Sequence, residues 1–152
     1  NSLTIQDLPI AKRTHEEEEF SISFYMKAGN TFDSLTNVIY DSSNNIGISI
    51  FKSNITFTIS DSSNTLSSIS YKIPEIGNAY HIAAVYSKRT MQLFVDGIAR
   101  SSKTLSEAFE FKAISNLNLL LGGNGYYILI DKLEVFNEAI STKYIDSEML
   151  LD

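Results

Sequence analysis

The residues best suited to chemistry in this chain lie in two similar polar loops. The sequence DSSNN starts at Asp41 and DSSN starts at Asp61, each directly after an apolar segment. Oxygens of Asp and Asn suit a hard divalent cation, so Asp41, Asn44, Asp61 and Asn64 are candidate metal ligands. The same side chains also hydrogen-bond to nearby backbone groups in ordinary turns. We expect turn formation, because neither loop has the spacing of an EF-hand.

Carboxylates placed for hydrolysis of a glycosidic bond are not evident. That reaction needs two carboxylates that flank the bond to be cleaved. Residues 16–19 are four consecutive glutamates, so their side chains would point alternately to opposite faces of a strand. Glu107 and Glu110 have no evident acidic partner. We interpret the 16–19 run as a solvated acidic turn.

Nucleophilic catalysis has no better support. The chain has two histidines, His15 and His81, no cysteine, and no serine within a G-x-S-x-G motif. The glycines of residues 122–125 lack the spacing of a phosphate-binding loop. We therefore predict that the chain is not an enzyme.

Length and composition favour one domain with a substantial core. The chain has 152 residues, 43% of them hydrophobic, and a net charge of −6. The negative charge argues against nucleic acid and anionic membrane surfaces as partners. No apolar run is long enough to insert into a membrane.

The segments that must position these residues are mostly strands. Some segments alternate apolar with polar residues, and others are rich in β-branched and aromatic residues; both patterns are typical of strands. These segments are residues 20–26, 46–50, 55–59, 69–73, 80–86, 91–95, 117–121 and 127–136. Asp96-Gly97 predicts a tight hairpin. Residues 105–111 could form one short turn, and residues 141–151 predict a helical segment capped by Ser141. The pattern predicts an all-β sandwich or barrel.

Three of these segments resemble one family. YHIAAVYSKRTMQLFVDG, residues 80–97, resembles the signature hairpin of laminin-G-like domains in the concanavalin A-like lectin/glucanase superfamily. YILIDKLEVFNEAIS, residues 127–141, looks like the closing strand of that family, and FSISFYMKA, residues 20–28, looks like an early strand. Ala79 departs from the family pattern, which usually has Trp there.

The resemblance implies an antiparallel two-sheet jelly-roll sandwich with a short C-terminal helical segment. We expect one such domain over residues 1–152, as a module of a larger protein. In the signature hairpin, Ile82, Ala84, Leu93 and Val95 should point between the sheets, with a tight turn over residues 87–90.

The resemblance also implies a ligand site on the concave sheet or at the loop rim, and in many such lectins a calcium ion. Recognition of a sugar needs an aromatic ring and polar groups that point away from the core. The candidates that meet this requirement are Tyr126, Tyr127, Asn124, Tyr25 and Lys27, with Lys88 and Arg89 for an acidic sugar.

Two principal functions stay open. The first is a non-catalytic carbohydrate-binding module of a surface, secreted or phage-tail protein, with a glycan or cell-surface polysaccharide as partner. The second is a structural or protein-adhesion module that joins other subunits of an assembly and binds no sugar. A divergent glycoside hydrolase domain is a third. The resemblance implies an extracellular, cell-surface or virion location.

Overall fold

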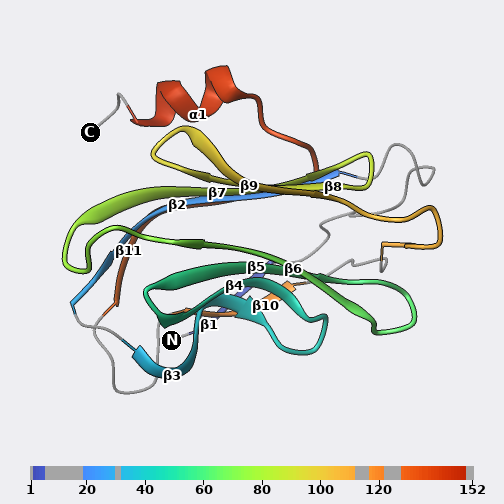
Figure 1. The fold of residues 1–152 in the computed structure, drawn as a ribbon, viewed down its shortest axis with the longest axis horizontal. Coiled ribbons are helices and arrows are strands. Elements are labelled where there is room, and N and C mark those ends of the chain that lie inside the picture. The colour runs from blue at the N-terminus through green and yellow to red at the C-terminus, as the bar shows by residue number, and fades with distance from the viewer. Residues whose placement is uncertain (1, 6–18, 30–31, 112–116, 122–127, 150–152) are drawn as a thin grey trace.

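The computed structural model describes residues 2–5, 19–29, 32–111, 117–121 and 128–149. They form two stacked sheets with one helix above the upper sheet (Figure 1). The elements in chain order are β1 Ser2–Ile5, β2 Glu19–Ala28, β3 Phe32–Asp41, β4 Ile46–Lys52, β5 Asn54–Ser60, β6 Leu66–Lys72, β7 Ala79–Ser87, β8 Thr90–Val95, β9 Ile98–Thr104, β10 Leu117–Leu121, β11 Ile128–Phe136 and α1 Thr142–Met149.

The strands pair in two antiparallel sheets. One has six strands in the order β1-β10-β3-β4-β5-β6, and the other has five in the order β11-β2-β7-β8-β9. Neighbours such as β10 and β3 are far apart in the sequence, as jelly-roll crossovers require. The predicted antiparallel jelly-roll sandwich is confirmed, and so is the short C-terminal helix.

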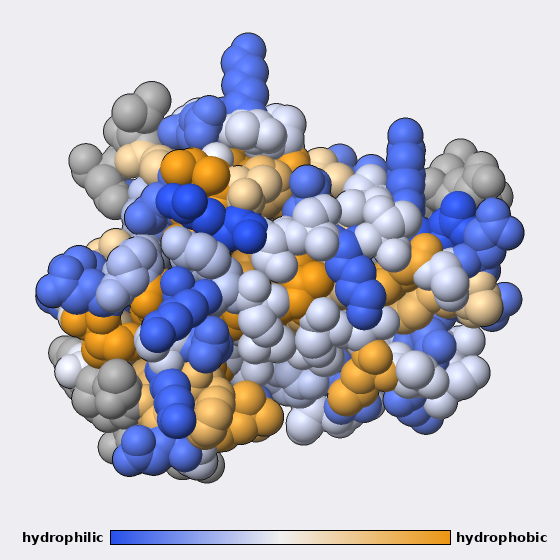
Figure 2. Space-filling view, in the orientation of Figure 1, coloured by the Kyte–Doolittle hydropathy of each residue, from blue (hydrophilic) through white to orange (hydrophobic). Residues whose placement is uncertain are grey.

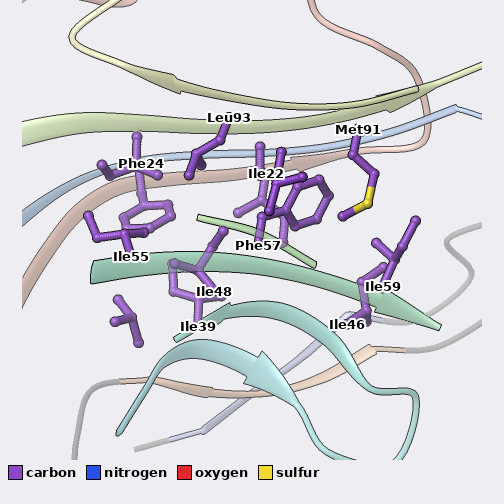
Figure 3. Packing of buried hydrophobic residues seen from close by; sticks show 14 of the residues in the cluster. Ile22, Phe24, Ile39, Ile46, Ile48, Ile55, Phe57, Ile59, Met91 and Leu93 are labelled. Carbon is purple, nitrogen blue, oxygen red and sulfur yellow. The ribbon is translucent and has the colours of Figure 1, made fainter. Parts of the chain in front are cut away.

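The core lies between the sheets. Figure 3 shows Ile22, Phe24 and Leu93 of the five-stranded sheet facing Ile48 and Phe57 of the six-stranded sheet. A regular strand such as β5 or β8 delivers every second residue to this layer, because the side chains of a strand alternate between its faces. Burial of one such side chain contributes about 1.5–3 kcal/mol. The four hairpin residues that we expected to point inward are all buried in this cluster.

The helix covers a second, smaller apolar cluster on the outer face of the five-stranded sheet. Ile145 of α1 is fully buried there with Ala83 and Val85 of β7 and Phe94 of β8. Ser141 caps the helix, since its Oγ accepts a hydrogen bond from the N–H of Tyr144 at 3.1 Å. Within the described part of the chain, no helix has the length and hydrophobicity needed to cross a membrane.

The sequence pattern did not predict three of the strands: β1, β3 and β9. The pairing of β3 with β4 contains two irregularities, which shift the face to which its side chains point and disrupt the alternation. The strand β9 is a sheet edge whose side chains are almost all exposed, so it lacks an apolar face. Residues 105–111 form a turn, in which the N–H of Phe109 donates to the carbonyl of Ser106.

Candidate functional site

A cleft of about 240 Å³ opens on the outer face of the five-stranded sheet. It is lined by Tyr25, Met26, Lys27, Ala79, Leu129 and Asp131, and we call it the Tyr25 cleft. Strand register sets its layout in two rows. Lys27 on β2 lies between Leu129 on β11 and Ala79 on β7, and Tyr25 lies between Asp131 and His81 in the next row. Ala79 has a small side chain, which leaves room above the sheet.

The ring of Tyr25 is supported from the β7 side. Its centroid is 4.9 Å from that of the His81 ring, with an angle of 69° between the planes. The imidazole of His81 is itself held, since its Nε2 lies 3.1 Å from the Oγ of Ser23. The backbone N–H of His81 donates to Asp96 at 2.8 Å. Tyr25 is therefore positioned by its neighbours and remains half-buried.

A β-bulge on β11 brings a cation to the other side of the ring. The register with β2 shifts between Asp131 and Glu134, and Lys132 takes a φ of 53°. Its backbone N–H donates to the Oδ1 of Asp131 at 2.9 Å. The Nζ of Lys132 lies 5.6 Å from the centroid of the Tyr25 ring. The bulge thus adds a second ammonium group to a site that already holds Lys27.

The site combines three kinds of group that a saccharide requires. Tyr25 and the half-exposed Leu129 offer an apolar surface for C–H groups. Lys27 and Lys132 can only donate hydrogen bonds, whereas the carboxylate of Asp131 accepts them. Asp131 is exposed at the rim. Lys27 and Asp131 of the cleft, together with Lys132 beside the Tyr25 ring, give two positive charges and one negative charge.

Three predicted binding residues, Asn124, Tyr126 and Tyr127, lie outside the described residues. The first described residue after them is Ile128, which pairs with Ala28 directly beside Lys27. Their role stays a prediction.

Lys88 and Arg89 lie at the opposite end of the five-stranded sheet. They form the two-residue turn between β7 and β8, and both have positive φ, at 49° and 64°. The nine residues of β7 separate them from the Ala79 end, a distance of about 30 Å at about 3.3 Å per residue. The structure does not bring these two side chains to the Tyr25 cleft.

The carboxylate of Asp41 is fully buried and accepts hydrogen bonds from groups of the protein. Its Oδ1 accepts hydrogen bonds from the N–H groups of Ser43 and Asn44, at 2.9 and 3.1 Å. Its Oδ2 accepts from the side-chain amide of Asn44 and from the N–H of Asn118 on β10, both at 2.8 Å. Asp41 therefore ties the β3–β4 turn to a neighbouring strand.

Asp61 plays a more local part in the second loop. Its Oδ1 accepts from the N–H groups of Ser63 and Thr65, at 2.9 and 2.8 Å, and Asn64 adopts a left-handed φ of 64°. In the described ranges, no three histidine, cysteine or acidic side chains gather as a metal site would require. Both aspartates therefore hold their own turns, and Asp41 also bonds to β10.

Exposed hydrophobic side chains are dispersed among the described strands. The large ones are Leu35, Phe51, Leu66, Ile98, Leu120 and Leu129, each on a different strand. Figure 2 shows hydrophilic and hydrophobic residues interspersed over one face of the molecule.

Sequence reasoning placed Tyr25 and Lys27 on the outer face, where both line the cleft, but did not select their neighbours. Alternation within β2 was enough to place these two on the outer face. Ala79, Leu129 and Lys132 join them only through strand register and a bulge, which one strand's pattern does not reveal. The one available signal for Lys132 was its place beside Asp131 in the closing strand.

Comparison with solved structures identifies similar folds in toxin binding domains. The receptor-binding domain of a botulinum neurotoxin C/D mosaic serotype matches with a TM-score of 0.74 and 17% identity over 88% of this chain. The binding domain of Paraclostridial Mosquitocidal Protein 1 matches with a TM-score of 0.73 and 13% identity over 86%. The binding domain of botulinum neurotoxin DC in complex with SialylT matches with a TM-score of 0.70 and 16% identity over 89%.

These similarities concern the fold, since the identities are low. This chain spans 36%, 36% and 35% of the lengths of those three chains. No curated protein matches the sequence with significance.

A match to a family profile assigns the chain to a protein family. The laminin-G profile described as the concanavalin A-like lectin/glucanases superfamily matches residues 4–146, nearly the whole chain. The match confirms the resemblance found in the signature hairpin and the closing strand. The chain therefore belongs to the concanavalin A-like lectin/glucanase superfamily.

Proposed function

We propose that this chain is a non-catalytic carbohydrate-binding module and that its glycan binds in the Tyr25 cleft. The observation that carries the proposal is the arrangement of Tyr25, Lys27 and Asp131 around one opening on the outer face of the sheet. Apolar and polar groups that converge in a cleft are the usual composition of a small-ligand site. The parent is a larger secreted, cell-surface or phage-tail protein, and the module acts outside the cell.

The bound sugar would lie against Tyr25 and Leu129. Its C–H groups would pack on these side chains, and its hydroxyls would donate to Asp131. Lys27 and Lys132 would donate to ring and hydroxyl oxygens, or to a carboxylate on an acidic sugar. The excess of one positive charge among Lys27, Lys132 and Asp131 favours a neutral or acidic glycan over a basic one.

Burial of the nearest nucleophile–base pair supports a binding role. Ser23 and His81 are 3.1 Å apart, which resembles the start of a catalytic dyad. Both are only 1% exposed, and His81 lies behind the ring of Tyr25. A ligand in the cleft would meet Tyr25 and would not reach this pair.

The test is a glycan array on the purified domain, with and without calcium. We expect binding to one glycan class, reduced about tenfold or more in Tyr25→Ala, because loss of a stacking ring and its buried area removes at least about 1.4 kcal/mol. Lys27→Ala should also weaken binding. The matched control is Lys72→Ala, which removes an exposed lysine at the end of β6, away from the cleft.

Two other results would revise the proposal. Binding that survives Tyr25→Ala but is lost in the Tyr126→Ala/Tyr127→Ala variant would move the site to the predicted loop residues. Calcium-dependent binding would direct attention to the loops of Asp41 and Asp61. Absence of binding to a broad array would overturn the lectin function and leave the protein-adhesion alternative.

A further inference from the structure

We propose a second, independent saccharide site in a pocket where the edges of the two sheets meet. The pocket measures about 330 Å³, more than the Tyr25 cleft, and falls in the size range of small-ligand sites. We call it the seam pocket; its lining is Asp61, Thr65, Ser67, Lys103, Thr104, Leu105, Ser106, Ala108 and Phe109. These residues come from the β5–β6 turn, β6, β9 and the segment that follows β9.

Strand register points side chains from both edges toward this pocket. Lys103 on β9 pairs with Met91, whose side chain is fully buried in the core. Ser67 on β6 pairs with the buried Ile59 in the same way. Paired residues share a face of the sheet, so Lys103 and Ser67 lie on the inner side of their edge strands. There they border the seam between the sheets and not the outer faces.

The segment over residues 105–111 is fixed to both sheets, so the pocket exists before any ligand arrives. On one side, the N–H of Leu105 donates to the carbonyl of Arg89 at 2.7 Å. On the other, the N–H of Ser62 donates to the carbonyl of Glu110 at 2.8 Å, and Asp61 forms a β-bridge with Phe111. A preformed pocket binds with a smaller ordering cost than a flexible one.

The chemistry of the lining matches a neutral sugar. Three hydroxyl side chains, of Thr65, Ser67 and Ser106, can each donate and accept hydrogen bonds. The Asp61 carboxylate adds an acceptor, and the ammonium of Lys103 adds donors. Because these two charges are opposite, the pocket as a whole favours neither an anion nor a cation.

The apolar part of the lining completes the match. Leu105 and Phe109 are 7% and 6% exposed and belong to the hydrophobic core, so they form a fixed apolar wall. A pyranose has an apolar C–H face and a hydroxyl rim, which suits this combination. We infer a neutral hexose or N-acetylhexosamine as the ligand class.

The test is an NMR titration of the ¹⁵N-labelled domain with neutral monosaccharides: glucose, galactose, mannose and N-acetylglucosamine. We expect saturable amide shifts at Thr65, Ser67 and residues 103–106 with at least one of them. Ser67→Trp, which fills the pocket, should abolish these shifts, and Lys103→Ala should weaken binding about threefold or more. The matched controls are Ser102→Trp, on the exposed face of β9, and Lys72→Ala, and neither should change the shifts.

The Tyr25→Ala variant separates this site from the proposed function. Shifts in the seam pocket should persist in that variant, even where binding in the Tyr25 cleft is lost. Absence of saturable shifts in the seam pocket with all four sugars would overturn the inference, as would shifts that Ser67→Trp leaves unchanged while its thermal unfolding matches that of the parent. If Tyr25→Ala abolished the amide shifts in the seam pocket as well as those in the Tyr25 cleft, the two sites would not be independent.

Discussion

At the residue scale, the two aspartate loops differ in how much of each carboxylate the fold uses. Asp41 accepts hydrogen bonds on both oxygens, whereas the two bonds to Asp61 described above use Oδ1 alone. Asparagine keeps one acceptor oxygen and replaces the other by a donor. Asp41→Asn should therefore lower the free energy of unfolding by about 3 kcal/mol, because a buried N–H would face a new donor. Asp61→Asn should cost less than about 1 kcal/mol.

Urea denaturation of the two variants measures this difference. Each is the control for the other, since both make the same chemical change in loops of similar sequence. Equal losses of stability would contradict the hydrogen-bond assignment at Asp41. A calcium-induced rise in melting temperature of the parent, lost in Asp61→Asn, would show that the second loop holds a metal ion.

Prediction of which side chains face away from the core succeeded where one strand was enough. Tyr25 and Lys27 follow from alternation in β2, because Phe24 and Met26 between and beside them are core residues. Lys88 and Arg89 were correctly placed in a turn, but nothing in the sequence shows at which end of the sheet that turn lies. The seam pocket has no sequence signal, since Asp61, Ser67 and Lys103 meet only in the folded chain.

At the element scale, one tyrosine fastens α1 to the sheet. The Oη–H of Tyr144 donates to the carboxylate of Glu134 on β11, at 2.8 and 3.0 Å to its two oxygens. Its ring contacts Phe136 edge-on at 5.6 Å. Tyr144→Phe removes the hydrogen bond and keeps the ring contact, so it should lower the free energy of unfolding by about 1 kcal/mol at neutral pH.

The stabilising effect of Tyr144 should depend on pH. The pKa of Tyr144 is raised above its ordinary value of 10.0. The larger cause is burial of the hydroxyl, and the next is the hydrogen bond that it donates to Glu134. The folded state therefore retains this proton at pH values where the unfolded state releases it, which disfavours folding. The stability contribution is full below pH 10.0 and declines as pH rises above it. Urea denaturation should show that the difference in free energy of unfolding between the parent and Tyr144→Phe narrows above pH 10.0. A difference that stays constant with pH would contradict this role.

Strand prediction worked for strands with a regular apolar core face and failed for those without one. β5 and β8 have alternating buried side chains on the core face and were recognised. The almost fully exposed β9 and the bulged β3 have no simple period. Turn chemistry was more informative, since Asp96 and Gly97 take the positive φ values, 52° and 79°, that an Asp-Gly hairpin requires.

At the scale of the whole molecule, one hydrophobic core joins the two sheets. The same buried cluster includes Phe24 and Leu93 from one sheet and Ile48 and Phe57 from the other. Neither sheet can bury its apolar face alone, so we expect the domain to unfold in one cooperative step. Thermal unfolding should give coincident curves by far-ultraviolet circular dichroism and by tyrosine fluorescence, the available probe in a chain with eight tyrosines and no tryptophan. Separate transitions would contradict a single folding unit.

The meeting of β6 and β9 at one side of the sandwich also bears on self-association. Each is the last strand of its sheet and presents backbone groups that a strand from another molecule could pair with. Lys72, Arg100 and Lys103 lie on these two strands, and Arg100 lies over the ring of Tyr71 at 5.4 Å. Two copies that approached through this side would bring like charges together before any backbone pairing formed. The basic residues of β6 and β9 thus oppose edge-to-edge pairing of two copies through these strands.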